Sequence, residues 1–119
     1  MPPLIALGAR LQLLSPAGER FLPLTFDVRD EAARDAALAT LSAPFDTIDL
    51  LLNNAGLALG TEPAQRASLS NWQTMVDTNV SALISMTHKL LPQLIAAKGA
   101  IINLGSVAGS YVYPGGNVY

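Results

Sequence analysis

The sequence predicts an α/β fold in which a doubly wound parallel sheet is covered by helices. Four short apolar runs of strand length alternate with two stretches whose apolar residues recur at helical spacing. Glycine, proline, asparagine or aspartate lies at most of the junctions, and these residues favour turns. Because strands that are joined through helices run parallel with right-handed crossovers, the alternation predicts one parallel sheet within 119 residues.

The first two predicted strands lie near the start of the chain. Residues Leu4 to Leu7 form an apolar run bounded by Pro3 and Gly8, which suits a buried strand. A second strand is predicted over Phe21 to Phe26. Pro23 interrupts it and has no N–H to donate, so this strand should lie at a sheet edge or bend there.

A helix is predicted next, over Glu31 to Leu41. Asp30 is a favourable N-cap, and alanine and leucine residues form the apolar stripe of this helix. The following run, Ile48 to Leu52, is apolar without interruption. Continuous apolar runs are typical of parallel strands that are covered on both faces, so this is the predicted third strand.

A long helical stretch precedes the last predicted strand. Ser70 and Gln73 have the spacing of a capping box, and apolar residues then recur at helical period as one long helix or two abutting ones. Pro92 should kink the last turns, and Lys98 and Gly99 suit a helix C-terminus. The final predicted strand covers Ala100 to Leu104.

Composition excludes several functional classes. The formal net charge is −2, which gives no broad basic surface for nucleic acid or anionic lipid, and neither partner is expected. The chain has no cysteine and only one histidine, so no metal site is expected. His88 lies late in the long helix and is interpreted as structural or solvated. No signal peptide or membrane span is predicted, and a cytoplasmic location fits.

Two motifs in this sequence resemble the short-chain dehydrogenase/reductase family. Asn53-Asn54-Ala55-Gly56 follows a predicted strand, and Ser106 follows another, with Tyr119 thirteen residues later. The resemblance implies that residues 1–119 form a partial NAD(P)-binding Rossmann-type domain covering the second to fifth strands of the family. The first strand–helix unit and everything after the catalytic tyrosine, including a lysine four residues on, are expected to be missing.

The same resemblance implies the catalytic roles. Ser106 would bind and orient the substrate, Tyr119 would act as the acid/base, and Asn79 would hold a water in a proton relay. A serine hydroxyl can donate to a carbonyl oxygen, and a tyrosine can exchange the proton when a nearby cation supports it. Tyr111 and Tyr113 are alternative candidates for the acid/base role. Alternatively, Asn79 marks a kink in the helix, or its side chain is a buried amide whose hydrogen bonds are made to the backbone.

Cofactor residues are expected after each strand, where doubly wound folds bind dinucleotides. No carboxylate lies near Arg10, which favours the 2′-phosphate of NADP, although Arg10 is equally well a solvated side chain. Asp27 can alternatively be a turn or capping residue. Small residues after the third strand let the backbone approach the cofactor, and the asparagine amides can fix the adjacent strands. The expected cofactor-binding residues are Arg10, Asp27, Val28, Asn54, Ala55, Gly56 and Tyr119.

Two functional hypotheses follow. The segments Asn54 to Gly60 and Pro114 to Tyr119 look like those of NADP-dependent 3-hydroxy acid dehydrogenases, which act on serine or allo-threonine. The first hypothesis is therefore a fragment of an NADP-linked oxidoreductase that acts on a small-molecule substrate, from a parent enzyme that is a homo-oligomer. The isolated chain is expected to be inactive. The alternative is a truncated, non-enzymatic remnant that binds an intact homologue through its long helix.

Overall fold

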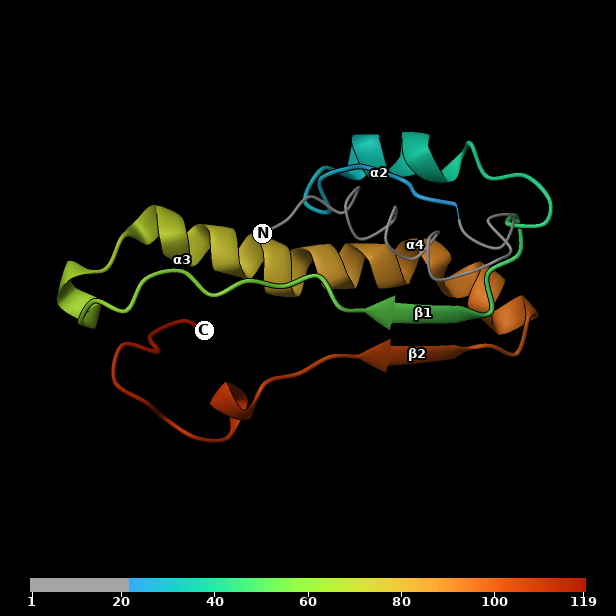
Figure 1. Ribbon diagram of the computed structural model, residues 1–119. Helices are drawn as coiled ribbons and strands as arrows, with labels where there is room; N and C mark the ends of the chain where they lie inside the picture. The colour runs from blue at the N-terminus through green and yellow to red at the C-terminus, as the bar shows by residue number, and fades with distance from the viewer. Residues whose placement is uncertain (1–21) are drawn as a thin grey trace, which may run out of the picture. The chain divides into compact units, whose positions relative to one another are not determined.

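The computed structural model describes residues 22–119 (Figure 1). The chain divides into two compact units, residues 1–46 and residues 47–119, and each is described here by itself. The predicted strand over Leu4 to Leu7 and the predicted cofactor residue Arg10 lie outside the described residues.

The first unit contains helix α2, Glu31–Leu38. Its predicted start is confirmed, because the Asp30 carboxylate caps it by accepting a hydrogen bond of 2.9 Å from the Ala33 N–H. The predicted end at Leu41 is wrong by three residues. The Thr40 hydroxyl donates to the Ala37 carbonyl at 2.7 Å, and this local bond helps to close the chain into a turn.

The strand predicted over Phe21 to Phe26 is not formed in its described part. Residues 22–26 carry no strand, and residues 27–46 contain no second strand that could pair with them. Pro23 removes one ladder donor from this segment, and an isolated extended segment satisfies none of its backbone groups. The apolar pattern was therefore insufficient evidence for a strand here.

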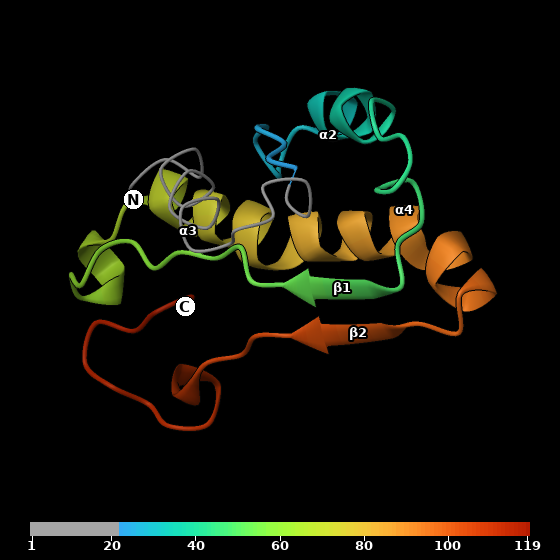
Figure 2. The ribbon, with the colours of Figure 1, turned by 45° about the vertical axis from the view of Figure 1, so that its right-hand side comes forward.

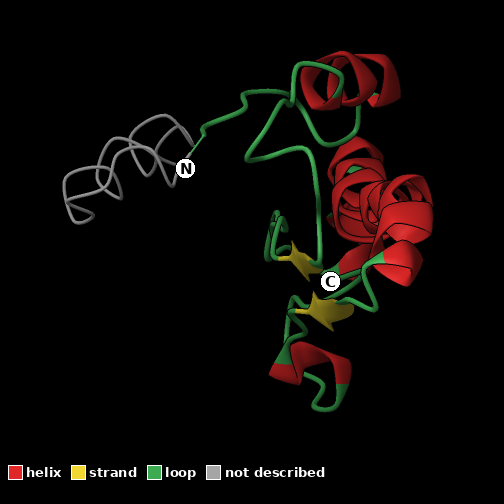
Figure 3. Ribbon diagram, turned by 90° about the vertical axis from the view of Figure 1, so that its right-hand side faces the viewer, coloured by secondary structure: helices red, strands yellow, loops and turns green. Residues whose placement is uncertain are grey.

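The second unit is built on two parallel strands, β1 (Leu50–Asn53) and β2 (Ala100–Asn103). Leu50 pairs with Ala100 at one end and Asn53 with Asn103 at the other, so both strands end level. Figure 3 shows the long helical stretch that joins the two strands on one side of this pair. The prediction that β1 is covered on both faces is wrong for the described residues, since Leu50 and Leu52 are 52% and 56% exposed.

A continuous helical rod connects the two strands and runs beside β1 (Figures 1 and 2). It comprises α3 (Leu69–Val76), the π-helix η3 (Asp77–Ser81) and α4 (Ala82–Ala96), which contains Pro92. Its buried side chains include Met75, Ala82, Leu90 and Leu94. Among the described helices, none is long and apolar enough to cross a membrane.

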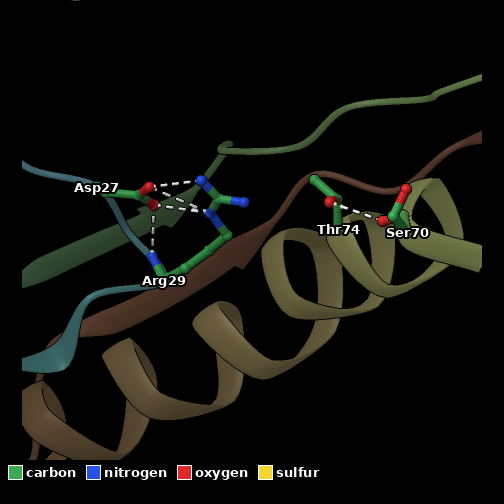
Figure 4. A network of polar contacts seen from close by, with 4 residues as sticks. All are labelled: Asp27, Arg29, Ser70 and Thr74. Carbon is green, nitrogen blue, oxygen red and sulfur yellow. Dashed lines mark hydrogen bonds and ion pairs between the residues drawn. The ribbon is translucent and has the colours of Figure 1, made fainter.

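Capping residues at both ends of the rod explain where it begins and where it ends. The capping prediction at Ser70 is wrong: Ser68 caps α3 by accepting from the Asn71 N–H, while Ser70 lies inside the helix, where its carbonyl accepts from the Thr74 hydroxyl (Figure 4). Ser68 can cap because its backbone is extended at ψ 122°. At the other end, Lys98 adopts a left-handed φ of 51°, and the Gly99 N–H bonds to the Leu94 carbonyl at 2.8 Å.

Candidate functional site

A cleft of about 340 Å³ opens where β1 and β2 end. The described residues that line it all belong to the second unit. They bring together the three sequence-predicted catalytic residues and four of the seven predicted cofactor residues. The lining consists of Asn53, Asn54, Ala55, Gly56, Asn79, Leu83, Leu104, Gly105, Ser106, Gly109 and Tyr119.

Asn53 fixes the floor of this cleft. Its Nδ2 donates to Asn103 Oδ1 of the neighbouring strand at 2.8 Å and to the Thr87 hydroxyl of α4 at 3.1 Å. One amide therefore ties both strand ends and the helix together. The sequence indicated that asparagine amides fix adjacent strands, but nothing in it identified Asn103 or Thr87 as the partners.

Asn79 forms one wall of the cleft from the π-helical turn η3. Its Oδ1 accepts from the Leu57 N–H at 2.9 Å, and its Nδ2 donates to the Leu57 carbonyl at 2.8 Å. This is the backbone-satisfied amide that the sequence left open as an alternative. Because an amide has two N–H groups and an oxygen with two lone pairs, one donor and one acceptor site remain for a further partner.

Ser106 lies at the exit of β2, beyond Leu104 and Gly105. It is exposed, and its Oγ accepts from the Ala108 N–H at 3.2 Å, which caps the short helical turn Val107–Gly109. The hydroxyl hydrogen of a serine that accepts in this way is still available to donate. The cap therefore fixes where the Ser106 oxygen lies without using its donor.

Tyr119 returns to the same cleft. Figures 1 and 2 show the chain turning back after β2, so that its C-terminus lies on the side where the strands end. Tyr111 and Tyr113 are not among the described residues that line the large cleft. Together with Tyr119 they line a smaller hollow of about 100 Å³ instead. Of the three tyrosines, Tyr119 is the one that lines the large cleft in the described part of the chain.

The predicted cofactor residues Asp27 and Val28 belong to the first unit. Asp27 accepts hydrogen bonds from the Arg29 side chain and from the Arg29 N–H, as Figure 4 shows. The Arg29 side-chain bonds come first among the causes that lower the Asp27 pKa to about 2. Both oxygens of this carboxylate are thus already engaged with Arg29.

The cleft contains little charge of its own. No lysine or arginine is among the described residues that line it. Within residues 22–119, no group of three or more histidine, aspartate or glutamate side chains is placed to hold a metal ion. His88 is exposed on α4, as expected of a solvated side chain. The site thus consists of hydroxyl and amide groups around small residues.

Comparison with known proteins gives a family match over most of the chain. The family model for short chain dehydrogenases matches residues 6–119. A serine 3-dehydrogenase of Agrobacterium fabrum is 54% identical over 107 residues, covering 90% of this chain and 43% of that protein. An NADP-dependent 3-hydroxy acid dehydrogenase of Salmonella typhi is 52% identical over 112 residues, covering 92% and 45%. The chain therefore spans less than half the length of these relatives.

Solved structures give the same match at the level of the fold. Serine dehydrogenase from Escherichia coli superimposes with a TM-score of 0.83 at 50% identity, covering 93% of this chain and 52% of that one. A closed form of serine dehydrogenase complexed with NADP+ superimposes with a TM-score of 0.76 at 54% identity, covering 79% and 38%. The predicted Rossmann-type α/β fold class is confirmed by these neighbours.

Proposed function

Because this chain belongs to the short-chain dehydrogenase family, we propose that the protein carrying it catalyses the reversible oxidation of a small 3-hydroxy acid, with NADP as the hydride acceptor. The observation that carries the proposal is the single cleft that gathers Asn54, Asn79, Ser106 and Tyr119. These residues are up to 65 positions apart in sequence, and they meet only because β1 and β2 are parallel and end level.

The cleft is compatible with the nicotinamide end of NADP. Ala55 and Gly56 are small and exposed, so a flat ring can lie against the main chain there. When bound, the cofactor supplies or accepts a hydride at its nicotinamide ring. Asn54, Ala55 and Gly56 would hold this ring, and Arg10, Asp27 and Val28 are proposed as further cofactor residues because the family pattern implies them.

The proposed chemistry uses two hydroxyl groups. Ser106 donates its free hydroxyl hydrogen to the substrate oxygen and so orients the reacting carbon. As a phenolate, Tyr119 takes the hydroxyl proton of the substrate while the hydride leaves the same carbon during oxidation, and the resulting phenol returns that proton during reduction. The remaining amide donor of Asn79 holds a water in the proton relay. Since none of the described lining residues is a lysine or arginine, the isolated 119 residues are expected to be inactive.

The substrate and cofactor assignments rest on the relatives. One is called a serine 3-dehydrogenase, another an NADP-dependent 3-hydroxy acid dehydrogenase, and one solved structure contains NADP+. The test is to purify the natural protein that carries these residues and to follow NADPH formation with serine, allo-threonine and simple alcohols. NADP-linked oxidation of the 3-hydroxy acids supports the proposal. Turnover with NAD alone, or with none of these substrates, refutes it.

A second proposal concerns partners. Six exposed apolar side chains lie within one face of the helical rod at helical spacing: Leu69, Val76, Val80, Ile84, Leu91 and Ile95. An apolar stripe of this length is typical of an interaction surface. We propose that it packs against the same stripe of a second copy in the parent enzyme. The non-enzymatic alternative, binding to an intact homologue, uses the same face.

Light scattering distinguishes a dimer of the parent enzyme from the non-enzymatic alternative. The natural protein should be a dimer or larger, and Ile84→Asp should produce monomers, because it places a charge in the centre of the stripe. The non-enzymatic alternative instead predicts a protein without turnover that assembles only when an intact dehydrogenase is added. A monomeric wild-type protein under both conditions contradicts both proposals.

A further inference from the structure

The segment that carries Tyr119 is tied to the rest of the unit by very few hydrogen bonds. Within the described residues, the bonds of residues 107–119 are local turns with one exception. That exception is the Asn117 side chain, whose Nδ2 donates to the Glu62 carbonyl at 2.8 Å across 55 positions of sequence. The segment is also largely exposed, with Tyr111 at 73%. Burial therefore contributes little to its placement.

The backbone around Asn117 is shaped for this contact. Asn117 has a left-handed φ of 37°, and Gly115 has a φ of 81°. A Cβ atom on Gly115 would lie only 2.5 Å from the Thr61 carbonyl oxygen, so the two segments meet backbone against backbone. The turn is closed by the Gly116 N–H, which bonds to the Tyr113 carbonyl at 3.1 Å. Residues 115–117 thus lie directly against residues 61–62.

The loop that receives Asn117 is itself fixed. Between β1 and α3, Leu57 is held by the oxygen and the nitrogen of the Asn79 side-chain amide, and the Leu59 N–H lies 3.4 Å from Met75 Sδ. This loop begins with Asn54, Ala55 and Gly56, which line the large cleft. Asn117 therefore connects the tyrosine segment to the same loop that forms the cofactor side of the cleft.

We infer that Asn117 is the positioning residue that holds Tyr119 at the cleft, an inference that rests on the proposed function. Tyr119 lies two residues after Asn117, so the Asn117–Glu62 bond is the long-range hydrogen bond nearest in sequence to the Tyr119 side chain. Proton transfer requires the phenolic oxygen within hydrogen-bond reach of the substrate oxygen. A displacement of about 1 Å costs on the order of a hundredfold in rate.

Three variants of the natural protein test this inference. Asn117→Gly removes the side chain and keeps a residue that tolerates the left-handed backbone. Asn117→Asp keeps the shape, but as a carboxylate it cannot donate to the Glu62 carbonyl. Gln73→Ala is the matched control, because it removes another exposed amide bond, the 2.8 Å contact from Gln73 Nε2 to Asp77 Oδ1. Both Asn117 variants should lower kcat by about tenfold to a hundredfold, with KM for NADP and the melting temperature unchanged.

A double-mutant cycle separates positioning from general structure. In a Tyr119→Phe background, Asn117→Gly should have no additional effect on kcat, because a positioning residue acts only through the hydroxyl that it places. An equal, additive loss in both backgrounds would overturn the inference.

A second readout does not need activity. With ring-labelled tyrosine, the NMR signal that disappears in Tyr119→Phe identifies Tyr119. Asn117→Gly and Asn117→Asp should both narrow this signal and shift it toward free tyrosine, while Gln73→Ala leaves it in place. A Tyr119 signal that does not move in the Asn117 variants overturns the inference, whether or not the protein is a dehydrogenase. If the signal moves but the wild-type protein has no NADP-linked activity, the proposed function fails alone.

Discussion

Asn79 and Leu57 are joined by two hydrogen bonds that run in opposite directions between one side-chain amide and one backbone unit. The amide comes from the π-helical turn η3, and Leu57 comes from the loop that follows β1. This pair fixes the distance between the helical rod and the Asn54 to Gly56 wall of the cleft. A π-helical turn inside an α-helix is often found at a functional site, and this one contributes Asn79 to the lining of the candidate cleft.

Replacing Asn79 should loosen the cleft. Asn79→Leu keeps the bulk but leaves the partly buried Leu57 N–H and carbonyl without partners, which costs about 1–3 kcal/mol of the free energy of unfolding. Urea denaturation measures this loss. The control Gln73→Ala, which removes an exposed bond, should change the free energy by less than about 0.5 kcal/mol. Equal losses in both variants would show that the Leu57 contact has no special role.

The hydroxyl of Thr87 should matter more than that of Thr74. Thr87→Val removes the 3.1 Å contact to Asn53 beneath the cleft, and a cost of about 1 kcal/mol is expected. Thr74→Val is the matched control, because it removes only an exposed bond to the Ser70 carbonyl within the same helix. Thermal unfolding of the two variants gives the comparison. If Thr74→Val proves the more damaging change, the Asn53 network does not fix the strand ends.

The junction between α4 and β2 predicts changes of opposite sign. Lys98→Gly should stabilise the protein by up to about 1 kcal/mol, since glycine adopts the left-handed φ of 51° without strain. Gly99→Ala should cost about 1–3 kcal/mol or more, because the added Cβ would overlap the Asp49 backbone carbonyl beside the first sheet pair. Urea midpoints measure both effects. A neutral Gly99→Ala would contradict the close approach of these two backbones.

Asp27 gives a pH prediction for the first unit. Its pKa falls from 3.8 to about 2 on folding, so its ion pair with Arg29 stabilises the folded state above pH 3.8 and is lost as pH falls toward 2. Both side chains are nearly half exposed, which limits the contribution to about 1 kcal/mol or less. The stability difference between wild type and Asp27→Asn should therefore shrink between pH 4 and pH 2. A difference that is constant over this range would contradict the assignment.

The sequence was sufficient for the regular elements of the second unit. The apolar runs Ile48 to Leu52 and Ala100 to Leu104 predicted two parallel strands. The structure confirms a parallel pair there, at Leu50–Asn53 and Ala100–Asn103, with the long helical stretch between them. These features depend on periodicity, which is local. The level strand ends then bring Ser106 and Asn54 to one cleft, while the functional roles assigned to these residues stay predictions.

What the sequence could not predict depends on contacts between distant residues. The Asn53–Thr87, Asn79–Leu57 and Asn117–Glu62 bonds span 34, 22 and 55 positions, and no spacing rule identifies such partners. Ser70 was chosen as the cap because Gln73 has the matching spacing, whereas the extended backbone of Ser68 decides the outcome. The expected burial of β1 failed for a related reason. An apolar pattern shows which residues favour burial, and the packed neighbours decide whether it occurs.

The most direct test of the central claim is the rate of NADP-linked serine oxidation by the natural protein and by its three Tyr→Phe variants. Tyr119→Phe should lower kcat by about 10²- to 10⁴-fold, the usual contribution of a positioned acid/base. Tyr111→Phe and Tyr113→Phe, which lie outside the described cleft lining, should each remain within a few-fold of wild type. Full activity in Tyr119→Phe would contradict the acid/base role of Tyr119.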